Sequence, residues 1–181
     1  EDGLLRLECD VALAALSVTP ASDTTVGRML IEQALGAATH AAAQIPQRAS
    51  NHQRVGNALV AWARFDPGAK SAADLSHVDF ARAERLAPVD AFILSDHATA
   101  ELSLGRGDRA LAPALKIVAL YPEAASGHAL EAAAWLAMKK PAEARAALLR
   151  ARDARWDPED ASRRAAVEAM LAAPLAPVPQ N

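Results

Sequence analysis

The sequence has little cysteine, little net charge and no long apolar run, and each of these absences excludes a class of protein. Its single cysteine, Cys9, excludes an internal disulfide and any multi-cysteine zinc site. The net charge of −3 leaves no basic stripe with interleaved aromatic residues, so we expect no binding to nucleic acid. No run approaches the roughly 18 consecutive apolar residues of a bilayer-spanning helix, so we expect no direct insertion of this segment into a membrane.

Residues suited to catalysis are also few. The five histidines lack the short H-x-x-x-H intervals of helical metal sites, and we interpret His97 and His128 as buried packing residues. Ser95, Asp96 and His97 are consecutive, but neighbouring helical residues point about 100° apart and cannot align as a triad. The sequence therefore predicts no metal, no cofactor and no catalytic residue. A helical hydrolase, which would need acids or histidines clustered in a groove, is the least favoured alternative.

Aromatic residues make up only 4% of the chain, whereas about a quarter of its residues are alanine. Alanine is the best helix former, and the β-branched residues that favour strands are sparse. Small side chains also let helices approach one another closely. The composition therefore predicts an all-α fold of closely packed helices.

One pattern ends at Pro88 and again at Pro122, so its period is 122 − 88 = 34 residues. Apolar and small residues at helical spacing predict a first helix in this unit. Gly105 and Gly107 then interrupt the pattern, and Asp108 is predicted to cap a second helix. Pro122 prevents that helix from continuing.

Two further units follow the same template. In 125–156, Pro141 suits the first position of the second helix, and Trp156 stands where the earlier units have proline. The unit 49–88 fits once eight additional residues are allowed, which we assign to a lengthened loop from Asp66 to Ser71. The chain is thus predicted to be an array of helix pairs.

Helical patterns continue at both ends of the chain. A divergent N-terminal pair is predicted over 1–46, its second helix capped by Ser22 or Asp23. A capping helix is predicted over 157–173, because it opens with an acid, a proline and two more acids. The Pro-rich tail, 174–181, is predicted to be an extended linker.

The 34-residue units resemble the tetratricopeptide repeat (TPR), a helix-pair motif of binding scaffolds. In the unit 91–122 the matching residues are Ala98, Gly105, Ala110, Ala114, Ile117 and Pro122. The resemblance also covers 49–88 and 125–156. It implies a single TPR-like domain over 1–173, folded as a right-handed superhelix of antiparallel helix pairs with a C-terminal capping helix.

In TPR arrays the first helix of each pair lines a concave groove in which a partner segment usually binds. The resemblance assigns to that groove Gln53, Asn57, Val60, Phe92, Ser95, Thr99, Leu102, Ala129, Ala133 and Leu136. This surface is neutral and shallow, unlike the grooves of TPR proteins that grip a C-terminal carboxylate. Trp62 has the best prospect of exposure among the tryptophans, and would then serve as a binding anchor.

The TPR resemblance implies a non-catalytic protein-interaction or assembly scaffold whose partner is a protein or peptide. A second resemblance, in the texture of the alanine- and arginine-rich repeats, is to the soluble C-terminal repeat domains of bacterial O-antigen ligase or polymerase proteins. It implies a periplasmic domain attached covalently to an upstream membrane domain, and both ends of the sequence look excised. A cytoplasmic location stays open at this stage.

Overall fold

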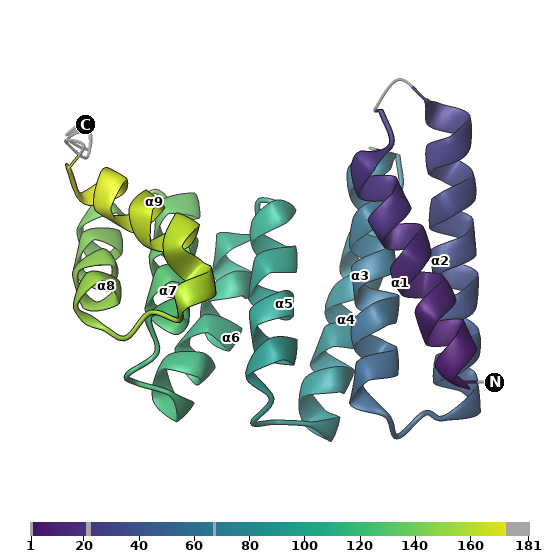
Figure 1. Ribbon diagram of the computed structural model, residues 1–181, viewed down its shortest axis with the longest axis horizontal. Coiled ribbons are helices and arrows are strands. Elements are labelled where there is room, and N and C mark those ends of the chain that lie inside the picture. The colour runs from purple at the N-terminus through teal and green to yellow at the C-terminus, as the bar shows by residue number, and fades with distance from the viewer. Residues whose placement is uncertain (1, 21–22, 67, 173–181) are drawn as a thin grey trace. The chain divides into compact units, whose positions relative to one another are not determined.

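The computed structural model describes residues 2–20, 23–66 and 68–172 (Figure 1). Over these ranges the chain is all-α, as the composition predicts. It divides into two compact units, residues 1–97 and 98–181, and the division falls within α5 (Ala91–Ser103). Each unit has a hydrophobic core of its own.

Within its described residues, the first unit has four complete helices: α1 (Asp2–Val18), α2 (Thr24–Gln44), α3 (Ala49–Phe65) and α4 (Lys70–Leu86). Short turns make successive helices antiparallel, and each of these helices packs on the next. Small residues, among them Cys9, Ala12, Ala38 and Ala58, fill the core. The segment 4–18, whose alternation also suits a strand, is helical.

The second unit continues with α6 (Gly107–Leu120), α7 (Ala125–Ala137), α8 (Pro141–Asp153), the short 3-10 turn η1 (Pro158–Asp160) and α9 (Ala161–Ala172). Here α6 packs on α7, α7 on α8 and α8 on α9. The buried Val167 of α9 joins the core that contains Ala132 and Leu148. The predicted capping helix is therefore confirmed.

Backbone hydrogen bonds join the segment that enters α7 to the segment that leaves α8. The Ala125 N–H donates to the Arg155 carbonyl at 3.0 Å, and the Arg155 N–H donates to the Glu123 carbonyl at 2.9 Å. The two segments form a short parallel bridge. Both ends of this helix pair are thus tied together by main-chain contacts.

The helices α5 and α7, each the first helix of its pair, end in the same way at positions 34 residues apart. After α5, Gly105 has φ +73°, and after α7, Lys139 has φ 59°. In each case the N–H groups of this residue and of the one after it donate to carbonyls of the helix. After α5, Gly105 donates to Leu102 and Arg106 to Glu101; after α7, Lys139 donates to Leu136 and Lys140 to Trp135. This is the Schellman end, which favours glycine because the left-handed conformation strains other residues.

The eight additional residues of the unit 49–88 do not form a loop, which corrects the sequence prediction. Both α3 and α4 are 17 residues long, whereas α7 and α8 are 13 residues each. Each long helix therefore has about one extra turn at 3.6 residues per turn. Added turns extend a buried apolar face, which a loop could not do.

Two predicted helix starts also differ in detail. Asp108 lies inside the first turn of α6, which begins at Gly107 after Arg106 and has no side-chain cap. Residues 158–160 form the 3-10 turn η1, and the α-helix begins only at Ala161. By contrast, Asp23 caps α2 as predicted, accepting a hydrogen bond from the Val26 N–H at 3.1 Å. The tail 174–181 and Ser22 lie outside the described residues.

Candidate partner-binding site

A hollow of about 360 Å³ lies beside Trp62 in the first unit. It is formed by α2, the end of α3 and the residue that follows, and its lining is Arg28, Ile31, Glu32, Leu35, Trp62, Phe65 and Asp66. Trp62 is 39% exposed, so one part of the indole is packed while another part reaches solvent. This volume is in the range of small-ligand pockets. It suits one or two side chains of a binding partner.

A glycine opposite Phe65 explains how this part of the unit is shaped. A Cβ atom added at Gly27 would lie 2.4 Å from Phe65 Cε2, so the ring packs directly on the backbone of α2. A second hollow of about 400 Å³ also includes Phe65, together with Leu13 and Leu16 of α1. Phe65 is therefore a wall shared by two hollows.

Charges of both signs lie at the edge of the hollow beside Trp62. Arg28, Glu32 and Asp66 are exposed, whereas Ile31 is buried and Leu35 is half-buried. An apolar floor with a mixed polar rim is the usual anatomy of a protein interface. The near balance of the rim favours a partner without a strong net charge.

The predicted groove residues of the first unit have different environments. The side-chain amides of Gln53 and Asn57 both donate to Asp96 Oδ2, at 2.8 and 3.2 Å. Val60 is only 8% exposed and belongs to the core, whereas Phe92 is 82% exposed. A partner at this surface would meet Phe92 and an Asp96 carboxylate that is already hydrogen bonded.

The predicted groove residues of the second unit are small or aliphatic and lack charge. Thr99 is exposed, and the others are half-buried: Leu102, Ala129, Ala133 and Leu136. Trp135, on the same helix as the last three, is also half-buried, and its indole N–H donates to Glu131 at 3.2 Å. This part of the surface is as neutral as the sequence indicates.

Two buried histidines occupy equivalent positions, near the start of α3 and α7. His52 Nε2–H donates to the Pro46 carbonyl at 3.0 Å, and His128 Nε2–H donates to the Pro122 carbonyl at 3.1 Å. The second ring nitrogens differ. His52 Nδ1 is 3.0 Å from Asp79 Oδ1, whereas His128 Nδ1 is 3.7 Å from Glu131 and makes no hydrogen bond to any described residue.

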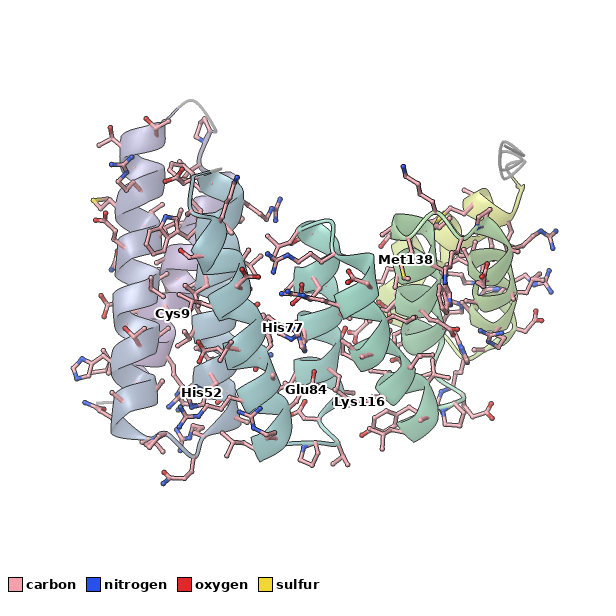
Figure 2. All side chains as sticks on the ribbon, turned by 180° about the vertical axis from the view of Figure 1, so that it is seen from behind. Cys9, His52, His77, Glu84, Lys116 and Met138 are labelled. Atoms are coloured by element: carbon pink, nitrogen blue, oxygen red, sulfur yellow. The ribbon has the colours of Figure 1, made fainter. Side chains whose placement is uncertain are left out.

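A third buried histidine belongs to a cluster that the sequence analysis did not predict. His97 stacks on Phe80 with ring centroids 5.1 Å apart, and its Nδ1 is 2.5 Å from Glu84 Oε1. His77 Nδ1 lies 3.1 Å from His97 Nε2. The interpretation of His97 and His128 as buried residues is confirmed, but His77, 20 residues before His97, was not expected near it. Figure 2 shows His77 and Glu84 on α4. Their seven-residue interval, about two helical turns, puts them on one face of the helix and is the one sequence feature that pointed to the cluster.

Cys9 is buried in the core of the first unit. The pKa of its thiol is raised to about 11, chiefly by desolvation and also by the nearby Asp10 carboxylate, while Arg54 acts in the opposite direction. The thiolate is the nucleophilic form of cysteine. Cys9 therefore contributes packing rather than reactivity at neutral pH.

The sequence matches no protein-family model and none of the curated proteins searched. Its fold is similar to that of solved TPR structures. TTC0263, a thermophilic TPR protein of Thermus thermophilus, superposes with a TM-score of 0.64 at 21% identity, over 90% of each chain. A structure described as MamA MSR-1 C2 gives 0.54 at 18%, over 80% of this chain and 86% of that one. A mutant form of MamA gives 0.52 at 15%, over 85% and 97%.

These comparisons define the class of the fold: antiparallel helix pairs of the TPR type, as the 34-residue period predicts. At such identities the likeness establishes the fold alone. None of the three structures is described as a glycan ligase or polymerase, so the O-antigen context stays a prediction. Within the described ranges, no helix is both long and apolar enough to cross a membrane.

Proposed function

We propose that this chain is a binding scaffold for another polypeptide, and that the hollow beside Trp62 receives an apolar side chain of that partner. TPR folds present rigid helical surfaces without catalytic machinery, which supports the general function. The specific support is Trp62 itself, a large aromatic residue that is partly packed and partly exposed beside a preformed hollow. Tryptophan and arginine are among the residue types most enriched at interface hot spots.

Rigidity of the site favours this use. Trp62 and Phe65 are on α3, whose 17 residues pack on both α2 and α4. Side chains held in this way lose little conformational entropy when a partner binds. The mixed charges of Arg28, Glu32 and Asp66 would then position the partner's backbone or polar groups around the apolar anchor.

The predicted groove is a second surface of the same scaffold. In the first unit it offers the exposed ring of Phe92 next to the residues that surround Asp96. An exposed phenylalanine adds nothing to the core of a monomer, and its burial against a partner would be favourable by roughly 1.5–3 kcal/mol. Binding at Trp62 and binding at Phe92 can be separated by mutation.

Selection from a random peptide library displayed on phage, with the intact chain as bait, tests this proposal. We expect selected peptides to share a large apolar residue and to lose at least about tenfold in affinity against Trp62→Ala. Leu115→Ala is the matched control, because Leu115 is 42% exposed and lies on α6, which contributes no residue to the hollow. Titration calorimetry with one selected peptide measures both effects.

Other results would contradict the proposal. If no peptide binds saturably, the scaffold function itself is unsupported. If peptides bind Trp62→Ala as tightly as the unmodified chain but lose affinity against Phe92→Ala, binding occurs at the groove and not at the hollow.

A further inference from the structure

A pair of imidazoles in the first unit has the geometry of a metal site. His77 of α4 and His97 of α5 place Nδ1 and Nε2 at 3.1 Å from each other. Their ring centroids are 5.1 Å apart and the ring planes are inclined by 52°, so the rings are tilted rather than stacked and the two nitrogens are the nearest donor atoms of the pair. We propose that these two nitrogens bind a divalent transition metal of the zinc class.

The separation of the two nitrogens agrees with shared coordination. With zinc–nitrogen bonds of about 2.0–2.1 Å, two ligands at the tetrahedral angle are about 3.3 Å apart, and two at a right angle are about 2.9 Å apart. The 3.1 Å separation lies between these values. The separation of the two nitrogens therefore needs little change for both to bind one ion, while the rings turn so that both lone pairs face it.

Glu84 gives His97 the form that a metal ligand requires. Its carboxylate accepts the His97 Nδ1–H at 2.5 Å, so the lone pair of His97 is on Nε2, the nitrogen that faces His77. A histidine that binds a metal almost always donates its other N–H to a carboxylate or carbonyl, which fixes the ring and raises its basicity. Phe80 stacks on the same ring at an interplanar angle of 5° and restricts it further.

Loading the site requires a tautomer change and no net loss of a proton. With both rings neutral and no metal bound, the Glu84 contact assigns the His97 lone pair to Nε2, so His77 donates its Nδ1–H to it. When a metal binds, the His77 proton moves to Nε2 through solvent, and both facing nitrogens become ligands. His77 is half-buried while His97 is buried, so the ion is held at the edge of the unit.

Metal chemistry narrows the ion to a small class. Imidazole ligands suit zinc, copper, nickel and iron, whereas calcium and magnesium require oxygen ligands. We therefore expect zinc, cobalt and nickel ions to bind and magnesium not to bind. The partner-binding proposal is independent of this one, because Trp62 is not part of the cluster.

Calorimetric titration of the tag-free chain with zinc chloride tests the site. We expect one saturable zinc per chain, lost in His77→Gln and retained in His40→Gln. His40 is an exposed histidine of α2 and controls for weak binding to surface imidazoles. Because His77 is only half-buried, its replacement is expected to leave the fold intact, which circular dichroism checks.

Cobalt gives a second measurement, since coordinated cobalt absorbs visible light with a spectrum that reports nitrogen ligation. Glu84→Gln is expected to weaken zinc binding by about 10–100-fold without abolishing it, the usual cost of losing an orienting carboxylate. Saturable binding that is unchanged in His77→Gln, or the absence of binding to the unmodified chain, would overturn the proposal. An unchanged affinity in Glu84→Gln would refute the role of Glu84.

Discussion

The helix pairs α3–α4 and α7–α8 follow one repeat pattern but differ in length, in core packing and in the turn between their helices. The first has two helices of 17 residues and the second has two of 13. In the first, Gly56 packs against Phe80. Ala132 is equivalent to Gly56, because each is the eighth residue of its helix. Leu148 is equivalent to Phe80, because it lies eight residues before Trp156 as Phe80 lies eight before Pro88; Ala132 and Leu148 share the second core. A smaller residue on one helix accompanies a larger one on the other. The repeat pattern therefore specifies which two positions meet in the core, while the side-chain volume is divided differently between those two positions in each pair.

Removal of the large side chain is expected to give the largest effect. Phe80 is fully buried and stacks on His97, so Phe80→Ala should destabilise the chain by about 3–5 kcal/mol. Leu148→Ala leaves a smaller cavity and should cost less, about 2–4 kcal/mol. Urea unfolding followed by circular dichroism measures both. An equal or smaller loss for Phe80→Ala would show that the first pair relaxes around its cavity.

Conversion of one pair into the other tests the shared volume directly. A Cβ atom at Gly56 would lie 2.7 Å from the Phe80 ring, so Gly56→Ala should cost about 1–2 kcal/mol, even though alanine favours helix. When combined with Phe80→Leu, which recreates the alanine–leucine combination, the total cost should be at least about 0.5 kcal/mol below the sum of the single costs. A strictly additive double-mutant cycle would contradict this account.

The equivalent histidines provide a comparison of smaller size. His52 uses both ring nitrogens, on Pro46 and Asp79, whereas His128 makes its one hydrogen bond within the described chain to Pro122. We therefore expect His52→Gln to destabilise by about 1–3 kcal/mol and His128→Gln by about 1 kcal/mol. Thermal melts of the two variants at one pH are the measurement. If His128→Gln proves the more harmful, its packing matters more than its hydrogen bond.

The smallest effect is expected at the turn of the second pair. Lys139 is held at φ 59°, where glycine has no steric cost, so Lys139→Gly should stabilise by about 1 kcal/mol. The reverse change at the equivalent position, Gly105→Lys, should destabilise by a similar amount. A small rise in melting temperature for the first and a fall for the second would confirm that the turn after α7 and the turn after α5 have the same geometry.

Sequence patterns predicted the helices well because their determinants are local. Pro88 and Pro122 limit their helices because proline lacks the backbone N–H that a helix needs, which requires no tertiary contact. Apolar residues also alternate in 4–18, as in a strand, but this segment is helical because the described chain has no strand with which it could pair. The eight extra residues of the unit 49–88 were wrongly assigned to a loop, because extra helical turns and a longer loop both lengthen a unit by the same number of residues. Proline and glycine at 67 and 68 favoured the loop interpretation, yet the chain between α3 and α4 is short.

The side-chain clusters were harder to predict because they depend on distant residues. The contacts of His97 with Glu84 and His77 cross from α5 to α4, and a 20-residue interval has no meaning until the two helices are packed. The position of Phe65, one wall of the hollow beside Trp62, depends on the absent side chain at Gly27, and the sequence does not tell which ring packs on that glycine. Exposure of Trp62 could be expected from its place near the end of α3, but its neighbours on α2 could not.

The bridge between Ala124 and Arg155 has a consequence for how such a chain can change over evolutionary time. The backbone enters α7 and leaves α8 at adjacent points, so the α7–α8 pair begins and ends at nearly the same place. Deletion or duplication of such a pair leaves the flanking chain ends close to where they were. The array can therefore gain or lose one pair at a time without a new connection being designed.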